Sequence, residues 1–274
     1  MSRPVRLPFR VELARQLSQW RVRIALGVLA VLPVVVRIAL LFGGPAPSGS
    51  GATDLTALAQ VSGATFAAFV LVLTGGFLAT LVAALLFGDL IAGEASRSTL
   101  KYLLTVPVPR LRLLAVKAQV AAVLLVAGLV ALTAVALLVG VLSYGPGGIQ
   151  VPGGPRLGLG DSVLRLLAAT ATAAAGLLWA AALGTLLTVV SDSPLAAAGG
   201  VVLMSILSRI LDQIPALGKV RVVLPTHWST AFHGFLEAPG DLAPVADSVL
   251  SGLIWAVVLG TLAAWRFTRK DVSG

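Results

Sequence analysis

The residues with the types and spacing to do chemistry lie in segment 88–119, a polar stretch between two long apolar runs. Glu94 stands near its start. Arg97 and Lys101 are four residues apart, so in a helix they share one face, and leucines occupy the opposite face. Pro107 ends this helix. An amphipathic helix of this kind either tethers two membrane spans at the surface or meets a partner there, and periodicity leaves both interpretations open.

Catalytic and metal-binding chemistry has little support in the sequence. The chain contains no cysteine, which excludes disulfides, thiolate metal sites and a cysteine nucleophile. His227 and His233 are six apart, on different faces of a helix, and there is no HExxH motif. A GxxxxGK[ST] phosphate-binding loop is also missing. We therefore expect no catalytic residues, no metal site and no cofactor on this chain, and if ATP drives it, the nucleotide belongs to a separate subunit.

The composition is that of an integral membrane protein. Of 274 residues, 58% are hydrophobic and only 11% charged, and the mean hydropathy is +0.99, whereas about 25% of residues are charged in soluble domains. The net charge of +9 does not indicate a nucleic-acid partner, because the basic residues of membrane proteins collect on the cytoplasmic side.

The N-terminal segment 1–23 is basic and amphipathic. It holds six arginines and one acid, Glu12. Apolar residues recur at helical spacing and predict an elbow helix that lies in the lipid headgroup plane. The residues expected to face the membrane interface are Phe9, Leu13, Leu17 and Trp20. A cleaved signal peptide is the alternative, but its basic lead would be long and no clear small-residue cleavage site follows.

Six apolar runs are long enough to cross a bilayer as helices, and the chain reads as one all-α transmembrane domain. Their expected bounds are 24–42, 62–90, 113–142, 163–190, 195–211 and 249–265. The second run exceeds the length that a perpendicular helix needs, so it either tilts or is interrupted at Gly75 and Gly76. The fourth is crowded with alanine and glycine, which predicts close packing among other helices. Arg209 and Asp212, three apart, are expected to pair locally.

Residues 213–247 contain no run long enough to cross and predict short helices at the outer surface. The residues expected to form an outer gate region are Pro225, His227, Trp228 and Phe232.

The distribution of bases predicts the orientation. Both termini and the Glu94 segment lie on one side if there are six spans, and that side carries 14 bases against 5 on the other. The positive-inside rule then places both termini and the Glu94 segment in the cytoplasm.

The same polar segment resembles the first cytoplasmic loop of type-2 ABC exporter permeases, whose pattern runs Gly-Glu, Gly-Thr-Leu-Lys, Leu-Leu, Pro-Val-Ser-Arg and a later Lys. The matching residues are Gly93, Glu94, Thr99, Leu100, Lys101, Leu103, Leu104, Pro107, Val108, Arg110 and Lys117. Ser98 replaces the usual Gly and Pro109 the usual Ser. The ending Trp-Arg-Phe-Thr-Arg-Lys-Asp-Val also resembles the family's C-terminus.

The resemblance implies a six-span permease with an elbow helix, a cytoplasmic coupling helix in loop 91–112 and short outer re-entrant helices. In that family the loop docks into an ATP-binding subunit. The residues that this assigns to coupling are Gly93, Glu94, Arg97, Thr99, Leu100, Lys101, Leu104 and Arg110. It further implies two ATP-binding subunits that hold ATP and Mg, a second permease copy in a homodimer, contact with membrane lipid, and a bacterial plasma membrane location.

Two other functions are weighed against an ATP-driven exporter. An ATP-independent secondary carrier would need ionisable residues deep in the membrane, and the expected spans hold almost none. An intramembrane enzyme would need a catalytic constellation, which the sequence does not show.

Overall fold

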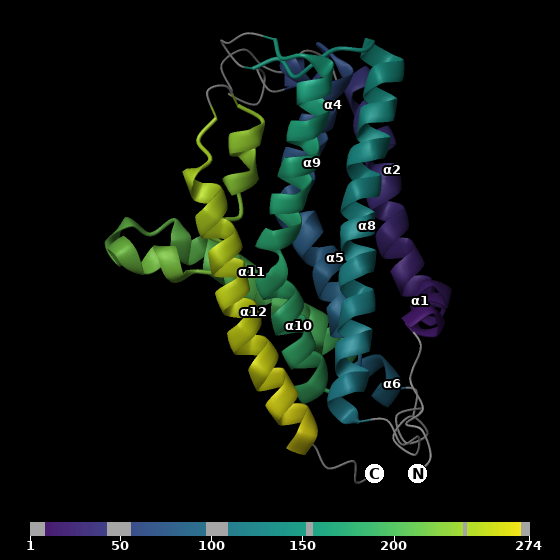
Figure 1. Cartoon of the computed structure of the whole chain (residues 1–274), viewed down its shortest axis with the longest axis vertical. Coiled ribbons are helices and arrows are strands. Elements are labelled where there is room, and N and C mark those ends of the chain that lie inside the picture. Colours follow the sequence, from purple (N-terminus) through teal and green to yellow (C-terminus); the bar gives the residue numbers. More distant parts are fainter. Residues whose placement is uncertain (1–8, 43–55, 97–108, 152–155, 238–239, 270–274) are drawn as a thin grey trace.

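The computed structural model describes residues 9–42, 56–96, 109–151, 156–237 and 240–269, which are mainly helical (Figure 1). The described elements are α1 (Phe9–Ser18), α2 (Trp20–Phe42), α4 (Gly63–Gly75), α5 (Phe77–Gly88), α6 (Ala92–Ser96), α8 (Arg110–Tyr144), α9 (Leu159–Gly176), α10 (Leu178–Val190), α11 (Pro194–Asp212), the 3₁₀ helices η1 (Pro215–Val223) and η2 (Ala231–Phe235), and α12 (Ala243–Arg269).

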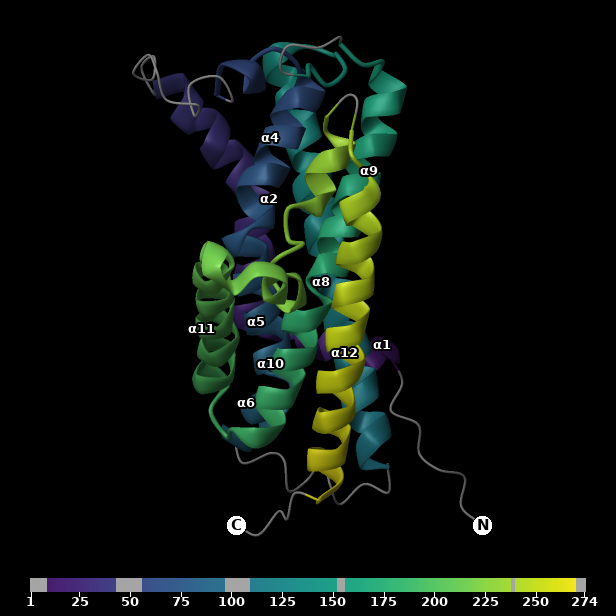
Figure 2. The ribbon, with the colours of Figure 1, turned by 90° about the vertical axis from the view of Figure 1, so that its left-hand side faces the viewer.

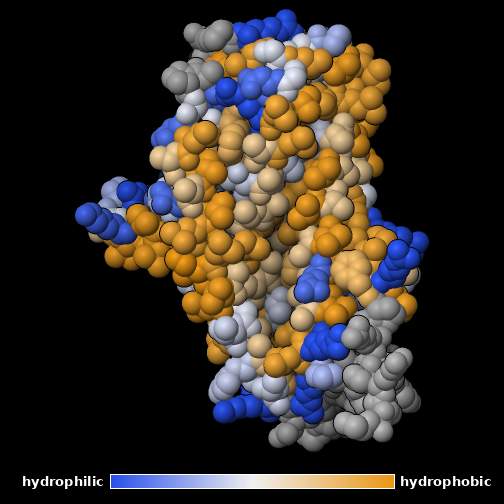
Figure 3. All heavy atoms as spheres, in the orientation of Figure 1, coloured by the Kyte–Doolittle hydropathy of each residue, from blue (hydrophilic) through white to orange (hydrophobic). Residues whose placement is uncertain are grey.

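Membrane-crossing length and apolar composition are found in α2, α8, the α9–α10 pair, α11 and α12. The pair α4 and α5 meets the same test as one bent span, which brings the number to six in the described part of the chain. Apolar residues cover most of the middle of the face in Figure 3, and hydrophilic residues gather toward its two ends. The predicted all-α integral membrane fold is confirmed.

The second span is interrupted where the sequence has two adjacent glycines. α4 ends at Gly75, α5 begins at Phe77, and their axes differ by 58°. Of the two alternatives left open by the length of this run, interruption is therefore correct. The fourth span also breaks, at Leu177 between α9 and α10.

Burial differs strongly between the spans. Half of the most apolar window of α9–α10 is buried, against 17% for α12 and 22% for α2. The small residues of this fourth span allow that close approach, as predicted. α12 and α2 are peripheral and present apolar side chains outward, as helices that face lipid or another subunit do.

α1, α6 and the C-terminal end of α12 lie toward the same end of the molecule, here called the α6 end (Figures 1 and 2). Several helices begin elsewhere than the hydropathy predicts. α2 begins at Trp20 rather than at residue 24, and α12 at Ala243 rather than at 249. Helices continue past the apolar core because polar residues at their ends can keep intrahelical hydrogen bonds in the interfacial region.

Two spans approach each other closely at a pair of glycines, Gly63 of α4 and Gly140 of α8. A Cβ added to Gly140 would lie 2.6 Å from the carbonyl oxygen of Gly63. We expect Gly140→Ala to lower the free energy of unfolding by about 1–3 kcal/mol, because the helices must separate. Gly260→Ala in α12 is the matched control, since its Cβ would meet nothing within 4 Å. Unfolding midpoints of the purified variants test this, and equal midpoints would contradict the close packing.

Candidate functional site

Three helices bring charged side chains together in a buried group near the α6 end. We call this group the buried charged cluster; its members are Glu12, Arg15 and Gln16 of α1, Glu94 of α6 and Lys117 of α8. Lys117 Nζ donates to Glu12 Oε1 at 2.9 Å and to Glu94 Oε1 at 3.4 Å. Arg15 donates from Nη2 to the same oxygen of Glu94. Lys117 and Arg15 therefore join α1, α6 and α8.

Gln16 completes the attachment of α1 to α8. Its side-chain nitrogen lies 3.1 Å from Glu12 Oε1 and 3.2 Å from the backbone oxygen of Lys117. Glu12, Arg15 and Gln16 are spaced three and four residues apart, so they project from one face of α1. This polar face turns inward, because Glu12 and Gln16 are buried.

The cluster contains two acids and two bases, so its formal charge is zero. The side chains of Glu12, Glu94 and Lys117 are only 1–2% exposed, whereas Arg15 is 36% exposed. Burial of a charge is tolerated when opposite charges and hydrogen bonds compensate it. Removing one member leaves an uncompensated buried charge, so these residues are energetically coupled.

The short helix α6 is also fixed from its other side. Thr188 of α10 accepts hydrogen bonds through Oγ1 from the backbone N–H groups of Ile91 and Ala92, at 3.0 and 2.9 Å. These bonds satisfy backbone donors at the start of the helix. α6 is therefore attached to α10 by Thr188 and to α1 and α8 by Glu94.

The residues that the sequence assigned to coupling fall into two groups. Gly93 and Glu94 lie in α6, and Arg110 is the first residue of α8. The remaining five lie outside the described residues: Arg97, Thr99, Leu100, Lys101 and Leu104. The coupling assignments themselves stay predictions.

The predicted elbow segment is divided between two helices in the structure, and its contact with the membrane stays a prediction. α1 ends at Ser18, and Trp20, which is 63% exposed, begins α2 instead. Phe9 and Leu17 are exposed, whereas Leu13 packs against the core. The division falls at the bend at Gln19, which redirects the chain from α1 into the first span.

Sequence reasoning missed Glu12, Arg15, Gln16, Lys117 and Thr188 as members of one site. A signal was present for two of them. Glu12 is the single acid in a segment with six arginines, and Lys117 is a base followed by a long apolar run. An isolated charge in such a context usually has an opposite partner elsewhere in the fold.

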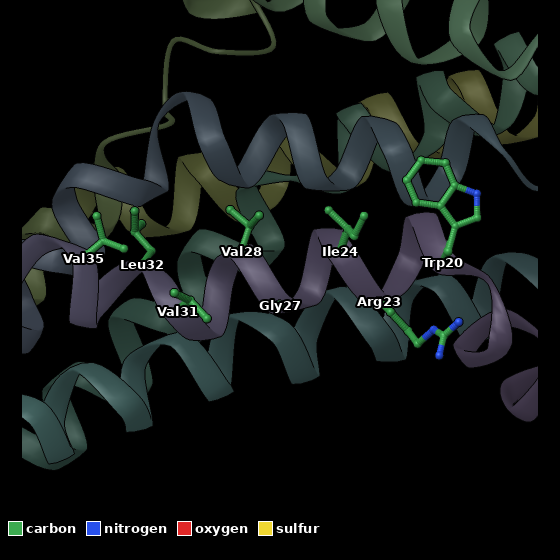
Figure 4. A pocket seen from close by; sticks show the side chains of 8 residues that line it. All are labelled: Trp20, Arg23, Ile24, Gly27, Val28, Val31, Leu32 and Val35. Carbon is green, nitrogen blue, oxygen red and sulfur yellow. The ribbon is translucent and has the colours of Figure 1, made fainter.

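A second ion pair and an apolar groove flank the cluster on α2. Arg21 Nη1 lies 3.3 Å from Asp89 Oδ1, which joins the start of the first span to the end of α5. The groove is shallow, with a volume of about 680 Å³. Figure 4 shows aliphatic side chains such as Ile24 and Val28 along α2, with Trp20 and Arg23 at one end. This arrangement suits contact with acyl chains or an apolar protein surface.

The predicted outer gate residues lie in and beside the 3₁₀ segment. Phe232 of η2 is buried against the break in the second span, because a Cβ on Gly75 would lie 2.6 Å from its ring. Pro225 is buried, and Trp228 donates from its indole nitrogen to Val222 O at 3.3 Å. His227 pairs with Asp212, its Nδ1 lying 2.5 Å from Oδ1. Their role as a gate stays a prediction.

The expected local pair between Arg209 and Asp212 is wrong. Arg209 Nη2 donates to the backbone oxygen of Gly76 at 3.1 Å, and Asp212 turns to His227 instead. Burial lowers the pKa of His233 in η2, and the Glu237 carboxylate partly offsets this decrease.

Six apolar spans in the described part of the chain define a multi-pass membrane protein. A family model described as ABC-2 family transporter protein matches residues 10–272. The chain therefore belongs to the ABC-2 transporter family and is the membrane permease of an ABC transporter, a class that works with ATP-binding subunits. No curated protein matches the sequence.

Proposed function

We propose that this permease is the membrane half of an ATP-driven exporter, and that the buried charged cluster passes motion from the ATP-binding subunits to the spans. The observation that carries the proposal is the position of Glu94. It opens the predicted coupling segment and is bonded to Arg15 and Lys117 in two other helices.

The contacts of α6 support the transmission of motion through Glu94. A displacement of segment 93–110 acts on α6, which is bonded to α1 and α8 through Glu94 and to α10 through Thr188. Buried charges resist separation because each would lose its compensation. The helices around α6 therefore move together with it, and α8 and α10 run from this region into the bundle (Figure 1).

The partners follow from the same proposal. ATP and Mg bind to two ATP-binding subunits, and no nucleotide site or metal site is assigned to the permease itself. No group of three or more metal-ligating side chains occurs within the described residues. Lipid surrounds the spans, and the membrane is the bacterial plasma membrane with both termini in the cytoplasm.

A second copy of the permease completes the transport path in this proposal. η1 projects sideways at about half the height of the molecule (Figure 1), where it carries Lys219 and Arg221. Bases at this depth are costly against lipid and acceptable beside protein or a water-filled cavity. Exposed apolar side chains on α11, such as Leu203 and Ile210, offer further contact area. These features support a homodimer with the cavity between the copies.

Co-expression with its ATP-binding subunit tests the function. We expect the two chains to purify as one complex, and we expect ATP hydrolysis to rise when the complex is reconstituted with transported compounds. A permease that transports in proteoliposomes without an ATP-binding subunit would contradict the proposal and favour the secondary carrier.

The predicted orientation can be measured with introduced cysteines, because the chain has none of its own. Arg112 is exposed near the α6 end, and a Cβ on Gly160 would meet nothing within 4 Å. We expect a membrane-impermeant maleimide to label Gly160→Cys in intact cells and Arg112→Cys only after the membrane is opened, because the α6 end carries most bases. The reverse pattern would overturn the orientation.

A further inference from the structure

Three elements end or bend around one point inside the bundle, away from the buried charged cluster. The second span bends between α4 and α5, the fourth breaks between α9 and α10, and α11 ends at Asp212. A small cavity there is lined by Gly75, Gly176 and Arg209, among others. Figure 2 shows η1 about halfway along the long axis, beside the end of α11. The charged side chain of Arg209 therefore lies at the point where these elements meet.

A polar pocket opens next to this junction. Its volume is about 490 Å³. Most of its lining residues carry polar groups, among them Arg209, Asp212, Gln213, Thr226, His227 and Ser229. A pocket for an apolar ligand would be lined by apolar side chains. The polar groups in this lining therefore suit a polar or charged ligand group.

The hydrogen bonds around the pocket leave one donor unsatisfied. Thr226 pairs with Ser208, their hydroxyl oxygens lying 2.6 Å apart, and Asp212 pairs with His227. Arg209 uses Nη2 to bond Gly76 O at 3.1 Å, but its Nε is buried and has no hydrogen-bond partner among the described residues. A buried donor of this kind normally has a partner. A ligand oxygen is a suitable one.

The charge around the pocket favours an anion. Between Ser208 and Thr230, three bases (Arg209, Lys219 and Arg221) stand against one acid, Asp212. Arg221 reaches the pocket edge, where its Nη1 donates to Asp212 O at 3.1 Å. The carboxylate of Asp212 is already engaged by Nδ1 of His227. The excess positive charge has no acidic counterpart in this stretch and would be compensated by a phosphate or carboxylate.

We propose that this pocket binds the anionic group of a ligand, a phosphate or carboxylate, with Arg209 as the main cation and His227, oriented by Asp212, as a second donor. The site is separate from the buried charged cluster and needs no ATP-binding subunit. A purely structural Arg209 would only hold the carbonyl of Gly76 at the bend of the second span.

Native mass spectrometry of the purified permease tests the site directly. The probes are phosphatidylglycerol, the zwitterionic phosphatidylcholine, and water-soluble glycerol phosphate. We expect the wild-type permease to prefer phosphatidylglycerol over phosphatidylcholine, and Arg209→Gln to bind it roughly tenfold more weakly, as expected for the loss of a charge-assisted hydrogen bond. Arg165→Gln is the control, because Arg165 pairs with exposed Asp161 in α9, away from the pocket.

Two further variants test the separate roles of Arg209 and His227 in the pocket. Arg209→Lys keeps the charge but lacks Nε, so we expect an intermediate affinity. His227→Gln keeps a hydrogen-bonding side chain without a charge and should lose less than Arg209→Gln. Binding of both anionic probes means that the site takes a water-borne anion, and binding of the lipid alone means that it takes an amphiphile. Equal binding by wild type and by all three variants, or no preference for the anionic lipid, would overturn the proposal.

Discussion

Lys117→Met should be among the most destabilising single substitutions in this permease. Lys117 is buried and donates to both Glu12 and Glu94, so its loss removes the buried cation that compensates these two buried acids. Removal of one partner from a buried ion pair typically costs about 3–5 kcal/mol. We expect a loss of that size in the free energy of unfolding, measured by denaturant titration of the purified protein.

A compensating substitution separates charge balance from packing. In the double variant Glu12→Gln with Lys117→Met, the remaining pair of Glu94 and Arg15 is neutral. We expect this variant to recover most of the lost stability, because each buried charge again has a partner. Arg112→Met is the control at an exposed base outside the cluster and should leave stability unchanged. A double variant as unstable as the single one would mean that shape, and not charge, determines the effect.

Glu94→Gln should separate assembly from coupling. Glutamine has nearly the shape of glutamate and keeps hydrogen-bonding ability, but it removes the charge that holds Arg15 and Lys117. If the cluster transmits motion, the variant still assembles with its ATP-binding subunit but loses roughly tenfold of its substrate-stimulated ATP hydrolysis, a typical size for coupling between two sites. Lys101→Ala, outside the described residues, should weaken the docking itself.

Complex yield and stimulated ATPase rate, measured on the same preparations, distinguish these outcomes. Asp161→Asn serves as the control, because it breaks an exposed pair in α9 without touching the cluster. Stimulation at the wild-type level by Glu94→Gln would reduce Glu94 to a residue that stabilises the fold, and the cluster would then have no part in coupling.

Much of the fold could be predicted from the sequence because the bilayer imposes it. Apolar runs of span length are separated by polar segments, so the number and order of the spans follow from hydropathy. Even the interruption of the second span had a local signal in Gly75 and Gly76. These features depend on residues that are neighbours in the chain.

The sites depended on contacts that no local pattern contains. Glu12 and Gln16 are four residues apart and share a face of α1, and that face turns toward Lys117, more than one hundred residues away. Arg209 and Asp212 are correctly spaced for a local pair, yet each has a partner from another element. A helical spacing tells which residues share a face and does not tell what covers it.

Photo-crosslinking from the two ends of α8 is the most direct test of the central claim that the permease receives its motion at the α6 end. A photo-reactive residue replaces Arg110, at the start of this helix, or exposed Leu142 near its other end. We predict that position 110 crosslinks to the ATP-binding subunit in the assembled complex and that position 142 does not. Crosslinking from 142, or from neither position in a complex that hydrolyses ATP, would contradict the account.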